Sequence, residues 1–393
     1  MFRSWDPVVL SSSTYELIYP PVENAPNDRN ITLPVSETII ISCNGGHFDD
    51  ITTKTLLATC NQDGQFEVQD AIIEFDKLSC VNFQPQVAKV SDTPCGPNAV
   101  LIEIGFQIGL NIKLVPQIVV CFDVKNLNPL YTNHNLTKSI GFIKSYLTTP
   151  YVVDPIYNVS IDFDELYSVD YQLSTINRLL GLPANSTRYV DPASCNPDPI
   201  ITTPGFCFSR RPLTYRGDFV YISQQDATYR YITVAAQWSF VDYNLEDLQN
   251  NVIDYVKKNK LDLEVYTGSY GIVTLPHADT GEDVELYLYV SGDVKAIPVP
   301  LLFWKLIYDP LTQRATVFVS VNNPHQTDVS KNIICEDISD GITWLTWEKH
   351  NVTKGYSYAC AYEDAKATIT YLPEIEVKGT LGTVRDKYHP PAV

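Results

Sequence analysis

The stretch FSRRPLTYRGDFVYISQQDATYRYITVAAQWSFVDYNLEDLQNNVIDYVKKNK, from Phe208 to Lys260, decides the fold of this chain. Residues 228–235 alternate as the residues of a half-buried strand do. Asn244 to Lys258 then repeats apolar residues at helical spacing, with Asp242 or Asn244 available as the N-cap. The apolar face of this helix consists of Leu245, Leu248, Val252, Ile253 and Val256. The stretch therefore predicts a strand, a loop and an amphipathic helix.

The sequence before this stretch is β-rich at first and then mixed. From Val8 to Asp123, short β-branched runs are separated by turn residues, which predicts an all-β region. Its most apolar part, Ala99 to Phe122, is interrupted by charged residues and by Pro116, so we expect half-buried strands and no membrane span. Helices are expected over 138–147 and 164–180.

Length and charge limit the classes of function. A chain of 393 residues exceeds one ordinary core, and we divide it into a β-rich N-terminal domain (1–125) and a second domain (126–393). The 46 Asp and Glu residues outnumber the 28 Lys and Arg residues, giving a net charge of −18. This charge disfavours nucleic acid as a partner unless a local basic groove exists.

The cysteines favour a disulfide-linked extracellular protein over one with buried free thiols. No Cys-x-x-Cys pair suggests zinc or redox chemistry, and the twelve-residue separation of Cys195 and Cys207 suits a local disulfide. The chain has nine cysteines, an odd number, so at least one thiol is free, paired with another chain, or missing an ancestral partner. The disulfide candidates are Cys43, Cys60, Cys80, Cys95, Cys121, Cys195, Cys207, Cys335 and Cys360.

Asn-x-Ser/Thr sequons also point to secretion and glycosylation. They lie at Asn30, Asn135, Asn158, Asn185 and Asn351. The opening MFRSWDPVVLSSS lacks the apolar core of a signal peptide, so we expect either a processed secretory chain with an initiator Met added or a numbering that starts at the mature end.

The stretch from Phe208 resembles the DNA/RNA non-specific endonuclease family, the ββα-metal nucleases, and most of all its secreted arthropod branch. In that family Asp-Arg-Gly-His is followed by Ala-Asp-Phe and then by Asn-x-x-Pro-Gln-Trp, and GDFVYISQQDATYRYITVAAQW matches the downstream part without gaps. The similarity continues in YTGSYGIVTLP (266–276), IPVPLLFWKLIYDP (297–310) and VNNPH (321–325). It implies an α+β protein: a β-rich N-terminal region followed by a ββα-metal (His-Me finger) nuclease-like domain with a central antiparallel sheet.

The resemblance also implies a mechanism whose base this chain lacks. In the family the motif His activates water, and an Asn on the following helix binds Mg²⁺. Counting back from Asp218, Arg210 matches the motif Arg, Arg211 its Gly and Pro212 its His, while Thr233 matches the Asn before Pro-Gln-Trp. Proline cannot accept a proton, so the chain is expected to be catalytically silent.

The metal-ligand position depends on the register of the helix. An ungapped count gives Asp242, which could bind a cation, and a shift by one residue gives Val241, which could not. The family's next acidic residue and its Arg become Asn250 and Asp254 in the first register and Gln249 and Ile253 in the second. Neither register preserves the family's set, so no cofactor is expected, with Mg²⁺ at Asp242 if any activity remains.

Three other patterns have alternative interpretations. Arg210, Arg211, Arg216 and Arg230 either retain phosphate binding without cleavage or pair with carboxylates, and we favour pairing. Arg216-Gly217-Asp218 suggests adhesion, but the resemblance explains it as part of the family loop. A relocated catalytic His325 or His134 is the less favoured alternative to a loop or core histidine.

We therefore predict a secreted nuclease-family protein that has lost catalysis and acts as a binding or structural protein through an unknown protein partner or self-assembly. The alternatives are a nucleic-acid-binding protein and a divergent metal-dependent endonuclease that uses Asp242.

Overall fold

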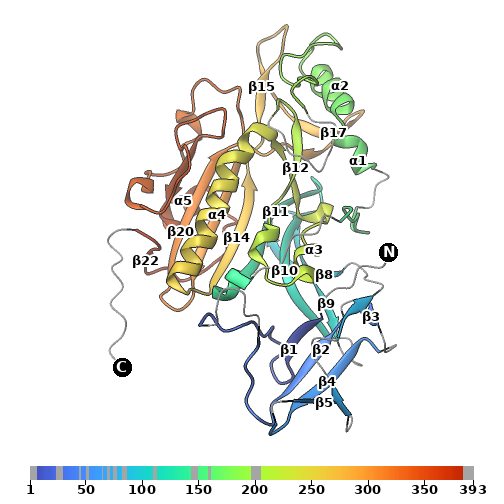
Figure 1. Ribbon diagram of the computed structural model, residues 1–393. Helices are drawn as coiled ribbons and strands as arrows, with labels where there is room; N and C mark the ends of the chain where they lie inside the picture. The colour runs from blue at the N-terminus through green and yellow to red at the C-terminus, as the bar shows by residue number, and fades with distance from the viewer. Residues whose placement is uncertain are drawn as a thin grey trace.

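Two antiparallel sheets and the elements packed on them make up the computed structural model of the chain (Figure 1). The structure describes residues 7–383 except 24–29, 44–45, 50–52, 64, 69–70, 74–77, 82–85, 109–112, 143–148, 158–160 and 196–204. The mixed α+β class and the central antiparallel sheet predicted from the sequence are both present.

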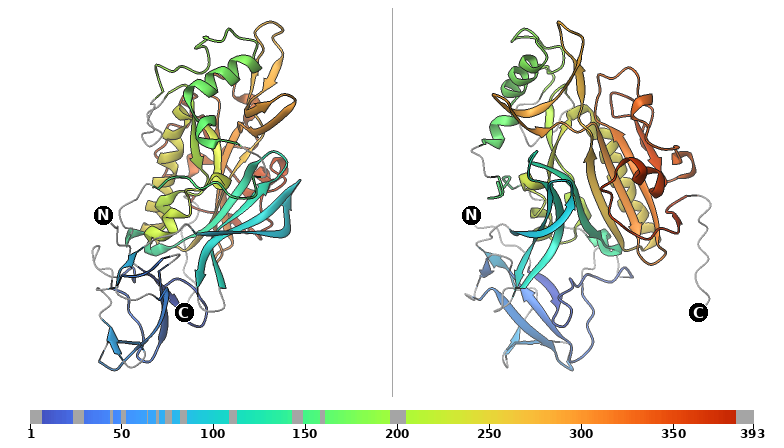
Figure 2. Two further views of the ribbon diagram at one scale, coloured as in Figure 1. Left: turned by 90° about the vertical axis from the view of Figure 1, so that its right-hand side faces the viewer. Right: turned by 180° about the vertical axis from the view of Figure 1, so that it is seen from behind.

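The N-terminal sheet has five strands in the order β1-β2-β4-β5-β6 and lies at one end of the molecule (Figure 2). Its strands are β1 (Val8–Ser11), β2 (Thr38–Ser42), β4 (Thr55–Cys60), β5 (Phe66–Val68) and β6 (Ala71–Ile73). The short strands β3 (His47–Phe48) and β7 (Cys80–Val81) pair beside it. Val8 and Leu10 of β1 and Ile40 of β2 pack against Phe106 and Ile108 of the central sheet.

The central sheet follows the order β21-β20-β19-β14-β11-β10-β9-β8, with β22 pairing in parallel to β20 and every other pair antiparallel. Its strands are β8 (Val87–Gly96), β9 (Ala99–Ile108), β10 (Lys113–Asp123), β11 (Asn128–Leu136), β14 (Leu263–Tyr270), β19 (Leu302–Asp309), β20 (Arg314–Val321), β21 (Ser357–Cys360) and β22 (Gly379–Thr380). The all-β prediction for the first region holds in its described residues. A division after residue 125 would cut this sheet between β10 and β11.

Helix α4 (Asp242–Asn259) covers one face of the central sheet (Figure 1). Leu248, Val252 and Val256, from the predicted apolar stripe, pack against Ile307 and Phe318 of the sheet. Along β19 the side chains alternate between the two faces, so Trp304, Leu306 and Tyr308 belong to a second core on the other side. The helix predicted from periodicity is therefore confirmed, and it begins two residues earlier than predicted.

The remaining elements surround this layer. The helices are α1 (Phe163–Leu166), α2 (Val169–Leu179), α3 (Ile222–Asp226) and α5 (Tyr362–Thr368). Short 3₁₀ turns are η2 (Lys138–Phe142), η3 (Arg216–Asp218), η4 (Tyr231–Thr233), η5 (Ser239–Val241), η6 (Ser330–Asn332) and η7 (Ser339–Gly341). The two-stranded pairs are β12 (Phe208–Pro212) with β13 (Val234–Trp238), β15 (Thr274–Pro276) with β16 (Asp283–Glu285), and β17 (Tyr287–Ser291) with β18 (Val294–Pro298).

Three sequence-based boundaries need correction. The helix expected over 164–180 is split into α1 and α2, because the Ser168 hydroxyl accepts a hydrogen bond from Tyr171 N and starts a new helix. The helix expected over 138–147 is a 3₁₀ turn over 138–142, and 143–147 lie outside the described residues. The strand expected over 228–235 begins only at Val234, since Thr233 closes a turn with its hydroxyl on the carbonyls of Thr228 and Arg230.

Four disulfides confirm that most of the cysteines are paired and are not a set of buried free thiols. They join Cys43 to Cys80, Cys95 to Cys121, Cys195 to Cys207 and Cys335 to Cys360. The pair predicted from its spacing, Cys195 and Cys207, is among them. Cys60 on β4 has a free thiol and is buried, so it accounts for the odd cysteine.

No helix in the described part of the chain is long and apolar enough to cross a membrane.

Candidate active site

Strands β12 and β13 and helix α4 form a compact ββα unit on the central sheet. Strand β12 pairs with β13 from Phe208–Trp238 to Pro212–Val234, and Leu213 N continues the pairing by donating to Thr233 O at 2.9 Å. Asn322 fixes β13 to the sheet, because its side-chain oxygen accepts from Trp238 N and its nitrogen donates to Ala236 O. The unit thus brings residues 208–212 beside the start of α4.

Neither Pro212 nor Thr233, the two motif positions in and before the paired strands, offers a base. Pro212 ends β12, and a proline side chain has no atom that accepts a proton. Thr233 is fully buried, and its hydroxyl donates to backbone carbonyls of its own turn. Both side chains therefore serve the backbone conformation of this loop.

Arg211 and Asp242 form an ion pair between β12 and the first turn of α4. The guanidinium Nη1 donates to Asp242 Oδ1, and the side chains are only 13% and 20% exposed. The N-cap of α4 is Val241, not Asp242 or Asn244 as predicted. Asp242 binds Arg211, and the buried Asn244 side chain is hydrogen-bonded to the backbone of Glu348 and Gly355.

The pair bears directly on whether a divalent cation fits here. The carboxylate that would hold the cation already binds a guanidinium through Oδ1. Within the described residues no three His, Cys, Asp or Glu side chains come together as metal ligands. A divalent cation at the start of α4 would therefore compete with Arg211 for the Asp242 carboxylate.

Arg210 lies on the opposite face of β12 within a group of aromatic rings. Its Nη1 donates to Asp164 at 2.6 Å and to the Tyr231 hydroxyl at 2.9 Å. Its Cζ lies 5.2 Å from the ring centre of Tyr151 and 5.8 Å from that of Tyr167. Its partner Asp164 is 80% exposed, so the ion pair itself is weak and the rings hold the guanidinium.

Tyr151 lies beside Arg210, whose Cζ is 5.2 Å from its ring centre. Burial raises the pKa of the Tyr151 hydroxyl, and the positive charges of Arg210, Arg216 and Arg211 oppose that rise. Arg216 donates to the hydroxyl of Tyr229, whose ring is 5.3 Å from that of Tyr151.

Arg230 does not belong to this group. It is buried, with two nitrogens on the Asp154 carboxylate and a third donating to Gln86 O at 2.6 Å. Arg210, Arg211 and Arg230 are each paired with a carboxylate, which is the arrangement favoured from the sequence.

A buried charged cluster lies beneath the unit. Asp218 accepts a hydrogen bond of 2.9 Å from His134 Nε2 and lies 3.9 Å from Lys305 Nζ. Burial lowers the pKa of His134 and of Lys305, and Asp218 opposes both shifts. The adhesion interpretation of Arg216-Gly217-Asp218 is wrong, because Asp218 is only 2% exposed.

A comparison with known proteins identifies the fold family. The sequence model of the DNA/RNA non-specific endonuclease family matches residues 98–365, more than half of the chain. The chain belongs to this family. The resemblance inferred from the blocks around β12, β13 and α4 is thereby confirmed.

Two curated relatives of this endonuclease-family chain are salivary proteins of flies. The salivary endonuclease of Lutzomyia longipalpis is 29% identical over 377 residues, which cover 91% of this chain and 79% of the relative. The salivary protein Tsal2A of Glossina morsitans morsitans is 24% identical over 370 residues, which cover 91% and 87%. A chain from the crystal structure of the EndoG/EndoGI complex is 15% identical with a TM-score of 0.36, covering 71% of this chain and 94% of that chain.

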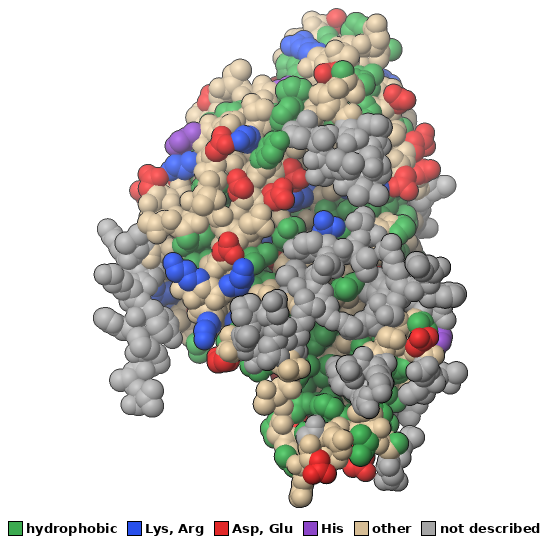
Figure 3. All heavy atoms as spheres, in the orientation of Figure 1, with side chains coloured by type: hydrophobic (Ala, Val, Ile, Leu, Met, Phe, Trp, Pro, Cys, Tyr) green, Lys and Arg blue, Asp and Glu red, His purple; other side chains and the backbone are tan. Residues whose placement is uncertain are grey.

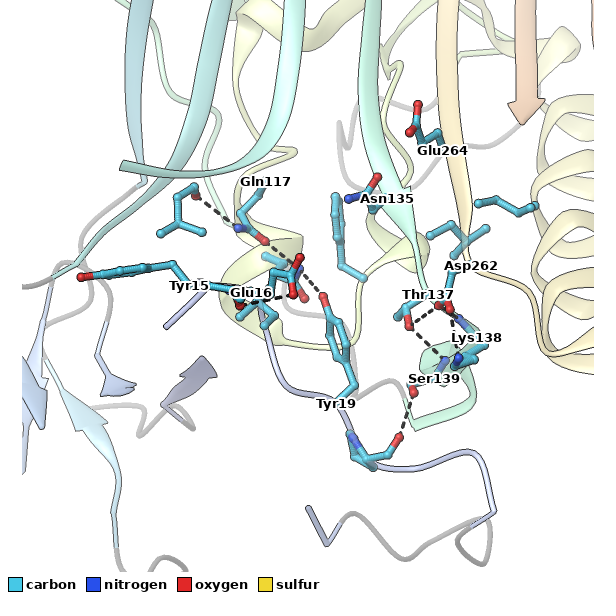
Figure 4. A pocket seen from close by; sticks show the side chains of 18 of the residues that line it. Tyr15, Glu16, Tyr19, Gln117, Asn135, Thr137, Lys138, Ser139, Asp262 and Glu264 are labelled. Atoms are coloured by element: carbon cyan, nitrogen blue, oxygen red, sulfur yellow. Dashed lines mark hydrogen bonds and ion pairs between the residues drawn. The ribbon is translucent and has the colours of Figure 1, made fainter. Parts of the chain in front are cut away.

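A hollow of this endonuclease-family protein lies away from the ββα unit, between the N-terminal segment and the central sheet (Figure 4). It has a volume of about 1030 Å³ and is lined by Tyr15, Tyr19, Gln117, Lys138 and Asp262, among others. Asn135, one of the five sequon residues, also lines it and is exposed. Asn30 and Asn185 are exposed elsewhere, Asn351 donates to Glu348 at 3.0 Å, and Asn158 lies outside the described residues.

Sequence reasoning did not find Lys305, Tyr151, Asp154 and Asp164. The sequence did contain a sign of Lys305, because this lysine interrupts the apolar run LLFWKLIY, most of which lies in the fully buried strand β19. The other three come from loops or from α1, where nothing in the local sequence indicates a partner on β12. His325, the less favoured catalytic candidate, packs among the rings of Tyr189, Phe206 and Trp238.

Proposed function

We propose that this member of the endonuclease family does not cleave nucleic acids by the family's mechanism and acts instead as a binding or structural protein. The observation that carries the proposal is Pro212 at the end of β12, where the resemblance places the motif His. Losing a general base costs about 10²–10⁴ in rate. The Arg211–Asp242 pair supports the proposal independently, because it occupies the carboxylate that a catalytic cation would need.

Plasmid digestion tests this proposal. We expect supercoiled plasmid to stay intact with Mg²⁺ or Mn²⁺. Cleavage that a chelator abolishes would overturn the proposal, and its loss in Asp242→Asn would assign the activity to a divergent metal-dependent endonuclease using that carboxylate.

A second candidate function is capture of nucleic acid without cleavage, favoured by the guanidinium groups of Arg210 and Arg216, which lie against Tyr151 and its neighbour Tyr229. Guanidinium groups bind phosphates, and tyrosine rings stack on bases. The net charge of −18 opposes it, and the face shown in Figure 3 intersperses Lys and Arg with Asp and Glu. Affinity for an oligonucleotide that falls steeply with salt would support capture, and a lack of binding at low salt would overturn it.

We also propose that the protein is secreted and glycosylated and that copies of it associate. Four disulfides and two relatives named as salivary proteins support an extracellular location. Exposed sequon residues support N-linked glycans, with Asn135 beside a hollow large enough for sugar rings. Expression in a secretory host should give a mass that drops on glycosidase treatment, and sizing chromatography with and without reductant should show whether copies associate.

A further inference from the structure

Asn135 is a sequon residue on an inner strand of the central sheet, where neighbouring strands leave little room for a glycan. Its strand β11 lies between β10 and β14, and Asn135 pairs with Glu264 of β14. The pairing between β11 and β10, however, ends at Asn133 and Val119. Two residues further along β11, at Asn135, the facing part of β10 pairs only with β9. The separation of β10 from β11 therefore leaves one side of Asn135 open.

The hollow of Figure 4 lies at this separation. Gln117 of β10 lines it on one side, Asn135 and Glu264 line it on the other, and most of residues 14–23 line it as well. Its volume of about 1030 Å³ lies at the upper end of the range of ligand pockets, about 300–1,000 Å³. The hollow therefore has room for the first sugars of a glycan that starts at Asn135.

The Asn135 side chain is available for such a bond. It is exposed, and no hydrogen bond joins its amide to a residue in the described part of the chain. Asn351 differs, because its Nδ2, the atom that would carry the sugar, donates to Glu348 at 3.0 Å. Thr137, which completes the Asn135 sequon, is held in place by donating to Asp262 at 3.1 Å.

The lining of the hollow suits a neutral, hydroxyl-rich ligand. Among its charged side chains, Glu16, Asp262 and Glu264 are acidic and Lys113, Lys138 and Lys260 are basic. Charges of both signs give no net attraction for a polyanion, whereas sugar hydroxyls both donate and accept hydrogen bonds. The half-buried rings of Tyr15 and Tyr19 add apolar surface on which the C–H faces of sugars can pack.

The wall formed by residues 14–23 is attached to the rest of the molecule at its far end. The Ser139 hydroxyl donates to Pro20 O at 2.8 Å, and Gln224 Nε2 donates to the Tyr19 hydroxyl at 3.1 Å. Glu16, nearer to β1, is exposed, and its carboxylate accepts a hydrogen bond from Thr14 of the same segment. Sugars in the hollow would therefore cover the exposed part of this wall.

We propose that the hollow between β10, β11 and residues 14–23 holds the chain's own N-linked glycan, attached to Asn135. In the attachment, Asn135 Nδ2 forms a bond to C1 of the first sugar and loses one proton, and the diphosphate of a lipid-linked oligosaccharide donor leaves C1. The inference rests on the glycosylation proposed above and adds that this glycan packs against the fold, while a glycan at Asn185 extends into solvent.

Treatment with peptide-N-glycosidase tests the proposal on protein secreted from mammalian cells. The enzyme converts each glycosylated Asn to Asp, so mass spectrometry of peptides follows every site separately. Release from Asn135 should be about tenfold slower in the native protein than in urea with reductant, because the first sugar is reached only when the structure opens. Asn185, exposed in the turn after α2 and outside the hollow, is the control and should agree within about twofold in the two conditions.

Digestion by a glutamyl endopeptidase tests the wall of the hollow. Asn135→Gln should speed cleavage after Glu16 in the native protein about fivefold, because the covering sugars are lost. Asn185→Gln is the matched variant, since it removes a sequon by the same substitution and should leave the cleavage rate unchanged. If Asn135→Gln is not secreted, the release rates of the wild-type protein decide the question without it.

Asn135 without a glycan, on a protein that carries one at Asn185 or Asn30, would overturn the inference and leave the proposed glycosylation intact. A protein with no glycan would overturn both. Equal release from Asn135 in the native and unfolded protein, or equal digestion of the two variants, would show that the glycan does not occupy the hollow. None of these results changes the plasmid assay, so the proposed loss of cleavage stands or falls separately.

Discussion

Nε2 of His134 donates a hydrogen bond of 2.9 Å to Oδ2 of Asp218, and both side chains are buried directly beneath the ββα unit. The same carboxylate oxygen lies 3.9 Å from Nζ of Lys305. One carboxylate therefore interacts with two buried basic groups, and we expect these interactions to stabilise the layer on which β12 packs.

Removing the charge of Asp218 should destabilise the fold. We expect Asp218→Asn to lower the free energy of unfolding by about 3 kcal/mol, because Lys305 is left as a buried cation without its partner. Urea denaturation with the disulfides intact measures this. The exposed Asp254–Lys257 pair provides the control, since Asp254→Asn should cost under about 0.5 kcal/mol.

Combining Asp218→Asn with Lys305→Met should recover most of the loss, because a buried ion pair can often be replaced by apolar groups. A single variant within about 1 kcal/mol of wild type, or a double variant less stable than the single one, would contradict the role given to this cluster.

Acid should destabilise the protein through His325. Burial among rings lowers the pKa of His325 to about 4, against about 6.5 in the unfolded chain. The unfolded chain therefore binds the proton at higher pH, and the stability is complete above pH 6.5 and is lost as the pH falls toward 4. The loss amounts to about 3 kcal/mol.

His325→Phe should flatten this decline, because the ring remains and the titration is removed. Denaturant titrations between pH 7.5 and about pH 4 compare the two proteins. His134, whose pKa burial also lowers, should leave a smaller slope of the same sign. Parallel pH profiles for wild type and His325→Phe would count against the assignment.

Cys60 should remain unreactive in the native protein and should not link two copies. Its thiol is buried in β4, and the other eight cysteines form disulfides within the chain. Iodoacetamide followed by mass spectrometry should label no cysteine in the native protein, one in urea, and all nine in urea with reductant. Rapid native labelling, or a dimer band on a gel without reductant, would contradict this arrangement.

The periodic parts of the fold could be predicted, and the parts held by distant contacts could not. Helix α4 follows from its apolar stripe, and β9 and β10 follow from their alternation. The residues before β13 also alternate, yet Arg230 is drawn into a buried pair with Asp154, 76 residues earlier, and Thr233 closes a turn. A contact between residues so far apart in the sequence cannot be predicted from the local residue pattern.

The candidate site shows the same division. The positions of Pro212, Arg211 and Asp242 came from the resemblance, and their proximity follows from the ββα unit. That Arg211 binds Asp242, and that Arg210 lies among tyrosine rings, depends on how β12 packs against α4 and α1. The predicted N-cap residues of α4 were wrong because both side chains, Asp242 and Asn244, bind residues distant in the sequence.

Restoring the base alone should not restore cleavage. Pro212→His returns a proton acceptor, but Arg211 still occupies the carboxylate of Asp242. We expect Pro212→His to stay silent on plasmid, and the double variant with Arg211→Gly to gain nicking that EDTA suppresses. Circular dichroism checks that both variants fold, and equal nicking by the single and double variants would show that Arg211 does not block the site.

The most direct test of the central claim is a single-turnover assay with wild-type protein in excess over supercoiled plasmid, incubated overnight with Mn²⁺. The account predicts that the supercoiled fraction stays equal to that of a protein-free control, with or without EDTA. Conversion to nicked or linear plasmid that EDTA prevents and that Asp242→Asn removes would contradict it.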